Sequence, residues 1–375
     1  MNTPSTTFLA PQHIQSSCTY AGLDVPITQA FLDFAARVRA NPELTAQAIA
    51  AHDCLFEGLG ECDEITAKAE AMFGDEAHLL RGLMVVESIR RVRERHAARG
   101  VSAQITQATL DHHPCSTLRD YAARNGHAGA DSWIWSWYRT VGSGHLYRLG
   151  RLEFFHEAWD YDHFRVFANV DTGEIVAMLN ANWHMTHDGY QDGTAWTSTL
   201  VETEEAIIGH PISPLGYALN KPVRLLRKHW QQVLGPGIIV LDVHIPGGEP
   251  LTLESLRAAM LQAETFFDHY YPGPPFVAFV CDSWLFSTQL EGMLGESSNI
   301  VRWQREGYLY PSGVGQEDFM NFIFGTPSID INTAPRDTRL RRAIVEWLQR
   351  GEILRGGGYF LLRRDLPRFG SQPYH

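Results

Sequence analysis

Apolar residues recur at three- and four-residue steps through the N-terminal part of the chain, which is the spacing of helices that bury one face. The longest such stretch covers 76–99, and Gly100 is well placed to end it. Shorter helices are predicted over 26–41, 42–56, 63–73, 104–125 and 132–140. Residues 1–25 are polar and turn-rich, so no regular element is expected there. The pattern predicts an all-helical N-terminal domain over 1–144.

Short apolar runs with strand-like alternation replace the helical pattern after Gly144. Strands are predicted over 145–155, 238–245, 276–281 and 358–363, with a hairpin formed by 164–170 and 174–179. Helices are predicted over 252–270, 287–294 and 340–350, and 182–222 is expected to be an irregular insertion. Because strands and helices alternate, we expect an α+β protein whose second domain, 145–375, contains a mixed sheet.

The composition is that of a globular protein, with 44% hydrophobic residues, 20% charged residues and a formal net charge of -12. A surface this acidic argues against general nucleic-acid binding, because phosphate backbones attract basic surfaces. The N-terminus has no basic and apolar leader, and no run of about 18 uncharged apolar residues occurs. We therefore expect a cytoplasmic protein with no membrane partner.

The five cysteines, which are Cys18, Cys54, Cys62, Cys115 and Cys281, form no C-x-x-C pair and are odd in number. A disulfide framework or a zinc knuckle normally shows paired, closely spaced cysteines. The sequence therefore predicts reduced thiols.

The block Leu146-Tyr-Arg-Leu-Gly-Arg-Leu-Glu-Phe resembles the junction of bacterial proteins that join an N-acyltransferase N-terminal domain to a GNAT-like C-terminal domain. Other blocks agree in order and spacing: Val243-His-Ile-Pro, Cys281-Asp-Ser-Trp-Leu, Ser297-Ser-Asn-Ile-Val, Ala334-Pro-Arg-Asp-Thr and Gly357-Gly-Tyr-Phe-Leu-Leu. The resemblance implies an acyltransferase with a GNAT-like mixed sheet.

The resemblance also implies a donor site beside the strand 238–245. A GNAT enzyme holds acyl-CoA or an acyl-phosphopantetheine as a co-substrate, with no tightly bound cofactor, and its phosphates lie at the N-terminus of the next helix. The residues in that place are Pro246, Gly247, Gly248, Leu251 and Thr252.

The usual acetyl-CoA signature of a basic or amide residue followed by spaced glycines is missing here, and Glu249 and Glu254 add negative charge. An ordinary Gly-Gly turn before a helix with N-terminal acids explains the loop equally well. A carrier-protein-bound acyl donor fits this loop better than free CoA.

The catalytic candidates follow from the same comparison. His244 ends the central strand, and a neutral imidazole suits a general base near pH 7. Asp282, Ser283 and Glu153 are expected to line the pocket of a small-molecule acceptor with an amine or hydroxyl group.

Each candidate also has a purely structural explanation. His244 can be a hydrogen-bonded core histidine, Asp282 or Ser283 can cap the following turn, and Glu153 can pair with Arg151. A nucleophilic role for Cys281 and an acid role for Tyr308 or Tyr310 are the weaker candidates, since such residues more often pack in a core.

Two other classes of function stay open. A degenerate GNAT-like domain would bind an acyl ligand or partner without catalysis. A metal enzyme would use the run His184-Met-Thr-His187-Asp188, although no H-E-x-x-H motif is present and no metal is expected. Two basic runs, 90–96 and 336–342, offer docking sites for an acyl carrier protein, but solvated helix faces explain them as well.

Overall fold

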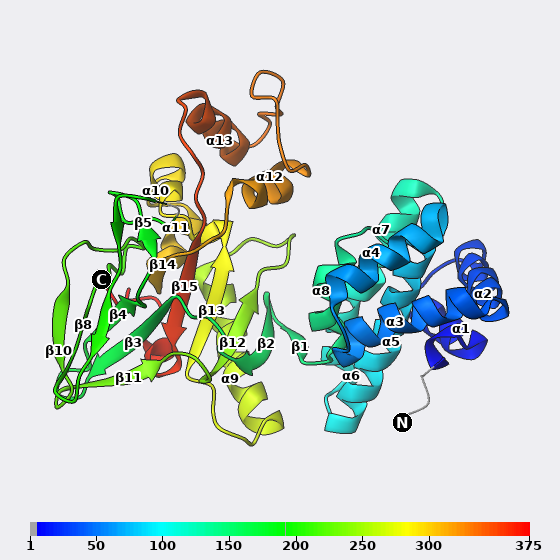
Figure 1. Cartoon of the computed structure of the whole chain (residues 1–375), viewed down its shortest axis with the longest axis horizontal. Helices are drawn as coiled ribbons and strands as arrows, with labels where there is room; N and C mark the ends of the chain where they lie inside the picture. Colours follow the sequence, from blue (N-terminus) through cyan, green and yellow to red (C-terminus); the bar gives the residue numbers. More distant parts are fainter. Residues whose placement is uncertain (1–5, 192) are drawn as a thin grey trace. The chain divides into compact units, whose positions relative to one another are not determined.

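The computed structural model describes residues 6–191 and 193–375, which form two compact units. The first unit runs to Leu149 and includes Glu153–Phe155; the second contains Gly150–Leu152 and His156–His375. Figure 1 shows the first unit as helices coloured blue to cyan, and the second as strands and helices coloured green to red. No helix among the described residues is long and apolar enough to cross a membrane. The predicted α+β fold class, with its helical N-terminal region, is confirmed.

The first unit is built from helices, and each of its α-helices except α1 was predicted. Its elements are η1 (Thr7–Leu9), α1 (Pro11–Tyr20), α2 (Val25–Ala40), α3 (Pro42–Glu57), α4 (Cys62–Phe73), η2 (Gly74–Glu76), α5 (Ala77–Arg99), α6 (Ala103–Leu110), the π-helical turn η3 (Asp111–Cys115), α7 (Ser116–Asn125), α8 (Ile134–Gly142) and the strand β1 (Leu146–Leu149). Gly100 ends α5 in the left-handed conformation, with φ +75°, as expected.

Helix α1 corrects the expectation of irregular structure before residue 25. Pro11 opens it at the first helical position, where a missing N–H costs nothing. Ile14 and Cys18, four residues apart, are fully buried on its inner face. With only two buried apolar positions in ten residues, the pattern was too weak to predict a helix, and packing decides its formation.

A Cys54–Cys62 disulfide corrects the expectation of five free thiols. Cys54 lies near the end of α3, Cys62 opens α4, and their Cα atoms are 5.5 Å apart. The chain reverses between the two helices, where Gly58 adopts φ +67°. The spacing of eight residues did not predict this disulfide. The two cysteines meet because the packing of α3 against α4 reverses the chain between them. Cys18, Cys115 and Cys281 are free and buried.

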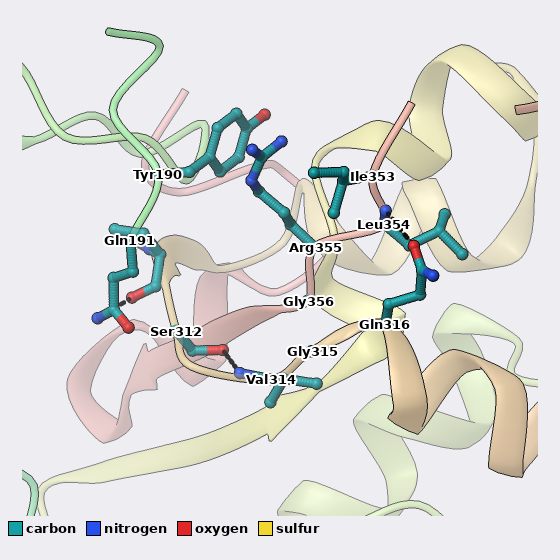
Figure 2. A pocket seen from close by; sticks show the side chains of 11 residues that line it. Tyr190, Gln191, Ser312, Val314, Gly315, Gln316, Ile353, Leu354, Arg355 and Gly356 are labelled. Atoms are coloured by element: carbon teal, nitrogen blue, oxygen red, sulfur yellow. Dashed lines mark hydrogen bonds between the residues drawn. The ribbon is translucent and has the colours of Figure 1, made fainter. Parts of the chain in front are cut away.

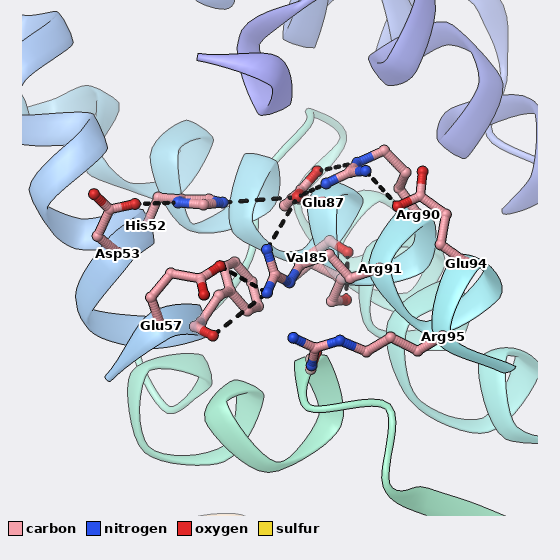
Figure 3. A network of polar contacts seen from close by, with 12 residues as sticks. His52, Asp53, Glu57, Val85, Glu87, Arg90, Arg91, Glu94 and Arg95 are labelled. Atoms are coloured by element: carbon pink, nitrogen blue, oxygen red, sulfur yellow. Dashed lines mark hydrogen bonds and ion pairs between the residues drawn. The ribbon is translucent and has the colours of Figure 1, made fainter. Parts of the chain in front are cut away.

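A buried carboxylate, Glu87 on α5, is the centre of an ion-pair network in the helical unit (Figure 3). Its Oε2 accepts a hydrogen bond of 2.9 Å from Nε of Arg90, and Nε2 of His52 lies 3.6 Å from its Oε1. Burial alone would raise the pKa of Glu87, but the hydrogen bonds from Arg90 and His52 outweigh burial and hold the pKa below its ordinary value. Glu87 is therefore ionised, and its charge is compensated inside the unit.

Replacing Glu87 by Gln should destabilise the helical unit by about 1–3 kcal/mol at pH 7, because a buried charged hydrogen bond is lost. The lowered pKa means that the unfolded chain binds more protons near pH 4, so the stabilisation by Glu87 is present above about pH 4.3 and is lost on acidification. Hydrogen exchange of α5 amides in the full chain, at pH 7 and pH 3.5, measures this effect.

Glu94→Gln is the matched control, because Glu94 pairs with the same Arg90 but is 60% exposed, and it should change stability by less than about 0.5 kcal/mol. Equal protection of α5 in wild type and Glu87→Gln at pH 7 would contradict the assignment.

The second unit contains the remaining strands and helices. They are β2 (Leu152–Ala158), β3 (Phe164–Asn169), β4 (Ile175–Leu179), β5 (His184–Met185), β6 (Trp196–Thr197), β7 (Leu200–Glu202), β8 (Ala206–Gly209), β9 (Pro211–Ile212), β10 (Val223–Leu226), β11 (Trp230–Leu234), β12 (Ile239–His244), α9 (Leu253–Tyr270), β13 (Ala278–Ser283), η4 (Trp284–Phe286), α10 (Gln289–Leu294), α11 (Asn299–Gln304), β14 (Tyr308–Pro311), α12 (Gln316–Phe324), α13 (Arg339–Gln349), β15 (Gly357–Leu362) and η5 (Arg363–Arg368).

The main sheet of this unit runs in the order β2-β12-β13-β15-β14. β12 and β13 are parallel and joined by α9, whereas β13–β15 and β15–β14 are antiparallel. A second sheet, β11-β3-β4-β9, shares one hydrophobic core with the main sheet through residues such as Val166, Ala177, Val240, Val280 and Phe360.

The segment 182–222, expected to be irregular, contains five short strands, β5 to β9. Each spans two to four residues, too few to show the period-two alternation from which a strand is recognised. Their pairing with β4, with β10 and with one another is decided by the fold.

Candidate active site

The parallel pair β12 and β13 brings His244 and Asp282 to one cavity. The register pairs Asp242 with Val280, and side chains two residues apart on a strand share a face. His244 and Asp282 are therefore the next residues along those faces. All four line a cavity of about 110 Å³, together with Glu157 near the end of β2 and residues of the segment that follows. Two separate sequence candidates, His244 and Asp282, thus lie together.

Three carboxyl groups in this cavity resist ionisation. Burial, with a smaller contribution from Asp160, raises the pKa of Asp242 to about 7, and burial with contributions from Asp242 and Asp160 raises that of Glu157 to about 7. Burial, with a smaller contribution from Asp242, likewise raises the pKa of Asp282 to about 7, even though hydrogen bonds from Tyr161 and Tyr310 oppose it. Groups with a pKa near 7 exchange protons readily at neutral pH, as general acids and bases must.

His244 is paired with one of these carboxyl groups. Its Nε2 lies 3.3 Å from Oδ2 of Asp242, and both side chains are partly exposed to the cavity. A carboxylate beside an imidazole fixes the ring orientation and stabilises the protonated ring. The arrangement can take a proton from an acceptor that enters the cavity.

Hydroxyl groups surround Asp282. The phenol of Tyr310 donates to its Oδ2 at 3.0 Å, and the nearby hydroxyls of Tyr161 and Ser312 also lower the pKa of the carboxyl group. Burial and Asp282 itself raise the pKa of Tyr161 and of Tyr310 above the ordinary value, so both phenols stay protonated. Tyr310 was a weaker candidate for an acid from the sequence, and it does face the cavity's carboxyl group.

Sequence reasoning missed Glu157, Asp242 and Tyr161. Asp242 was within reach, because it stands two residues before His244 on a predicted strand and so on the same face. Glu157 and Tyr161 gave no signal, since the pairing of β2 with β12 places their segment here.

The predicted donor loop is open. Gly247 and Gly248 are exposed, no atom lies within 4 Å of a Cβ built on either, and Gly248 has φ +103°. Thr252 caps α9, accepting from the backbone N–H of Ser255 at 3.2 Å. The Nε of buried Arg151 donates to the carbonyl of Glu249 at 2.8 Å, which connects the loop to the turn before β2. Pro246 is buried and Leu251 half-buried at the two ends of the loop.

Ser283 and Glu153 do not line the cavity. The Ser283 hydroxyl accepts from the backbone N–H of Leu285 at 3.2 Å and caps the turn after β13. Glu153 belongs to the helical unit and is 1% exposed, and its Oε2 lies 3.0 Å from Nε2 of His113. Ser283 therefore caps a turn, as its structural explanation predicted. Glu153 has a structural partner too, which is His113, whereas the expectation named Arg151.

His112, His113 and Glu153 form the one group in the described part of the chain whose spacing suits a metal ion. Nε1 of Trp137, which can only donate, points at Nδ1 of His113 at 3.4 Å. Neutral His113 must then carry its proton on Nε2, where it donates to Glu153. Neither ring nitrogen of His113 is available to a metal without breaking a hydrogen bond, so these residues fit a hydrogen-bonded relay better than a metal site.

The other sequence candidates have structural surroundings. His184, His187 and Asp188 are exposed on β5 and the following turn and form no such group among the residues described. Burial raises the pKa of the Cys281 thiol well above its ordinary value, which disfavours a thiolate nucleophile. Tyr308 is buried and donates to the carbonyl of Ile212.

The two basic runs make internal contacts. Arg90 pairs with Glu87 and Glu94, and Arg341 pairs with Asp337 at 2.9 Å. These contacts agree with the interpretation of both runs as helix faces.

Comparison with known proteins identifies the family. Residues 146–360 match the GNAT-like C-terminal domain, and residues 12–141 match the N-acyltransferase N-terminal domain. The first match covers more than half of the chain, so the chain belongs to the family with this domain; by family it is a GNAT-like acyltransferase. The resemblance inferred from the sequence is confirmed. No curated protein matches the sequence.

Solved structures share the fold over nearly the whole chain. An acyltransferase mutant in complex with octanoyl-CoA is 17% identical, with a TM-score of 0.60, and the match covers 94% of this chain and 88% of that one. An acyltransferase in complex with decanoyl-CoA is 18% identical, with a TM-score of 0.57 and coverage of 93% and 86%. An acyltransferase with decanoyl-CoA and teicoplanin is 18% identical, with a TM-score of 0.50 and coverage of 93% and 99%.

The raised pKa of Asp282 predicts that the substitution Asp282→Asn stabilises the folded protein at alkaline pH. Between about pH 4 and pH 7 the folded state binds more protons than the unfolded chain, so the stability contributed by Asp282 falls as the pH rises. At pH 8 the variant should be about 1–2 kcal/mol more stable than wild type, and this advantage should be clearly smaller at pH 5, because most of the change falls between about pH 5 and pH 7. Thermal unfolding at both pH values measures the difference.

Asp188→Asn, which removes an exposed carboxylate of the same unit, should change little at either pH. A variant Asp282→Asn no more stable than wild type at pH 8 would contradict the raised pKa.

Proposed function

We propose that this protein transfers an acyl group from acyl-CoA to a small-molecule amine, with His244 as the general base. The observation that carries the proposal is the cavity in which His244 lies beside Asp242 and shares its walls with Asp282 and Glu157. The cavity is open, as a catalytic domain requires and a degenerate one does not.

The acidity of the cavity selects the amine over the hydroxyl acceptor. Four of its lining residues are Glu157, Asp160, Asp242 and Asp282, and none is Lys or Arg. Crowded carboxyl groups with raised pKa values are stabilised by a cation, and a protonated amine is the acceptor that brings one. His244 then removes a proton from the ammonium or from the attacking nitrogen, and its pairing with Asp242 stabilises the imidazolium that forms.

The thioester carbonyl is attacked by the amine nitrogen, which forms the amide bond while the C–S bond breaks. The CoA thiolate that leaves must be protonated, and the phenol of Tyr161 is the hydroxyl donor in the cavity wall, whereas Tyr310 is buried behind Asp282. We assign Asp282 to orienting these phenols, Ser283 to capping the turn, and Glu153 to holding His113 in the helical unit.

We propose that the donor's pantetheine and phosphates lie along Pro246–Thr252. The open glycines and the N-terminus of α9 support this assignment, because backbone N–H groups at a helix start attract anions. The structural relatives solved with octanoyl-CoA and decanoyl-CoA favour a medium-chain acyl group. Since CoA thioesters are metabolites of the cytoplasm, we place the enzyme there.

His244→Asn should lower kcat by about 100-fold or more, because it removes the general base but keeps the volume of the ring's inner half. Release of CoA from octanoyl-CoA, followed with a thiol reagent over a panel of primary amines, amino sugars and amino acids, measures turnover. Calorimetry should show CoA binding unchanged.

His269→Asn, at an exposed position on α9, is the matched control and should retain wild-type turnover. Full activity of His244→Asn would exclude His244 as the base, and no turnover by wild type with any amine would count against the function itself.

Gly248→Ala should weaken CoA binding by about tenfold, because a Cβ at φ +103° strains the loop and occupies the space that the donor approaches. Gly173→Ala, with φ +78° and equally open surroundings in the β3–β4 hairpin, controls for strain. Titration calorimetry with CoA and octanoyl-CoA measures both. If wild type binds neither ligand, the donor is a thioester on a carrier protein instead of CoA.

A further inference from the structure

The second unit has another cavity, of about 180 Å³, whose charge is opposite to that of the first (Figure 2). Arg355 is the only charged residue among the described residues that line it, and the others are neutral, including Tyr190, Gln191, Ser312 and Gln316. In a chain with a formal net charge of -12, a cavity without a described carboxylate but with an arginine is unexpected. Among the described residues that line the first cavity, four are acidic and none is Lys or Arg.

The guanidinium of Arg355 has no carboxylate within 4.0 Å in the part of the chain that the structure describes, unlike several other arginines of this unit. Arg363 pairs with Glu264 and Asp268, and Arg305 with Glu291 and Glu296. Arg355 instead lies over the ring of Tyr190, 5.2 Å from its centroid, as Figure 2 shows. A stacked guanidinium keeps its N–H donors in a fixed plane, ready for a carboxylate or phosphate.

Other donors line the same cavity. The Oε1 of Gln316 accepts from the backbone N–H of Leu354 at 3.3 Å, which fixes the side chain and orients its amide N–H₂ group. Gly315 and Gln316 are the N-cap and first residue of α12, so the positive end of this helix dipole also faces the cavity. Arg355 and the amide of Gln316 favour an anion, while Glu317 and Asp318 in the first turn of α12 offset part of the positive charge of the helix start.

The two cavities lie close to each other. Ser312 lines the Arg355 cavity and is near enough to Asp282, which lines the acidic cavity, to lower the pKa of its carboxyl group. A molecule with an ammonium group at one end and an anionic group at the other is the ligand whose charges match both.

We propose that the Arg355 cavity binds an anionic group of the acyl acceptor, a carboxylate or a phosphate, so that the enzyme acylates zwitterionic amines of the amino acid or peptide kind. The inference rests on the proposed function, since the acceptor's amine is the group placed in the acidic cavity. Arg355 is then a residue that determines specificity and takes no part in proton transfer.

Matched pairs of dipeptides with a free and an amidated C-terminus, supplied with octanoyl-CoA, test the proposal. Wild type should prefer the free acid by tenfold or more in kcat/KM. Arg355→Gln should abolish this preference by raising KM for the acid at least tenfold, with kcat for the amide unchanged, and Arg355→Lys should restore part of it. Arg350→Gln removes another arginine stacked on an aromatic ring, that of Trp347, and should leave the preference intact.

Calorimetry of the same dipeptides with the full chain separates this inference from the proposed function. If no dipeptide is acylated but the free acid binds and Arg355→Gln abolishes its binding, the anion site stands and the acyl transfer does not. If the substitution changes neither binding nor the preference, the inference is overturned. If the substitution weakens the binding of CoA but not that of dephospho-CoA, the anionic group that Arg355 binds belongs to the donor. The assignment to the acceptor is then wrong.

Discussion

The parallel pairing of β12 with β13 is the constraint on which the rest of the second unit depends. Side chains on a strand repeat every two residues, so this register places Asp242 and His244 on a common face beside Val280 and Asp282. The strand pair thereby forces acidic groups together in a partly buried place. Such groups cannot all ionise, and their pKa values rise to about 7. In the proposed reaction a cationic acceptor relieves this repulsion, which links the strength of binding to the chemistry that follows.

The two cavities of the unit differ in how their charge is compensated. In the acidic cavity, Tyr310 donates a hydrogen bond to the carboxyl group of Asp282, and His244 is paired with that of Asp242. In the second cavity, the ring of Tyr190 supports Arg355 without neutralising it. The helical unit shows the contrasting case, because Glu87 has its opposite charges built in and stays ionised. A buried charge that is compensated by other protein groups, as in Glu87, stabilises the fold. A charge without such a partner among the described residues, as in Arg355, is suited to binding a charged ligand.

Most elements followed from local pattern, and the departures have a common cause. α1 buries too few residues to be recognised, the strands within 182–222 are too short, and the Cys54–Cys62 pair depends on the turn between two helices. The site shows the same division. His244 and Asp282 end apolar strands and were within reach of sequence reasoning, but Glu157 reaches their cavity only because β2 joins the sheet.

The sequence by itself determined the α+β class, the family, the strand that carries His244 and the Gly-Gly loop before α9, because each of these is written in residues close together in the chain. The tertiary structure decided which polar groups meet. It directed Glu153 to His113 and Ser283 to the turn after β13, and it brought Ser312 to Asp282. Strand pairing and helix packing join segments that are far apart in sequence, and local periodicity holds no record of those partners.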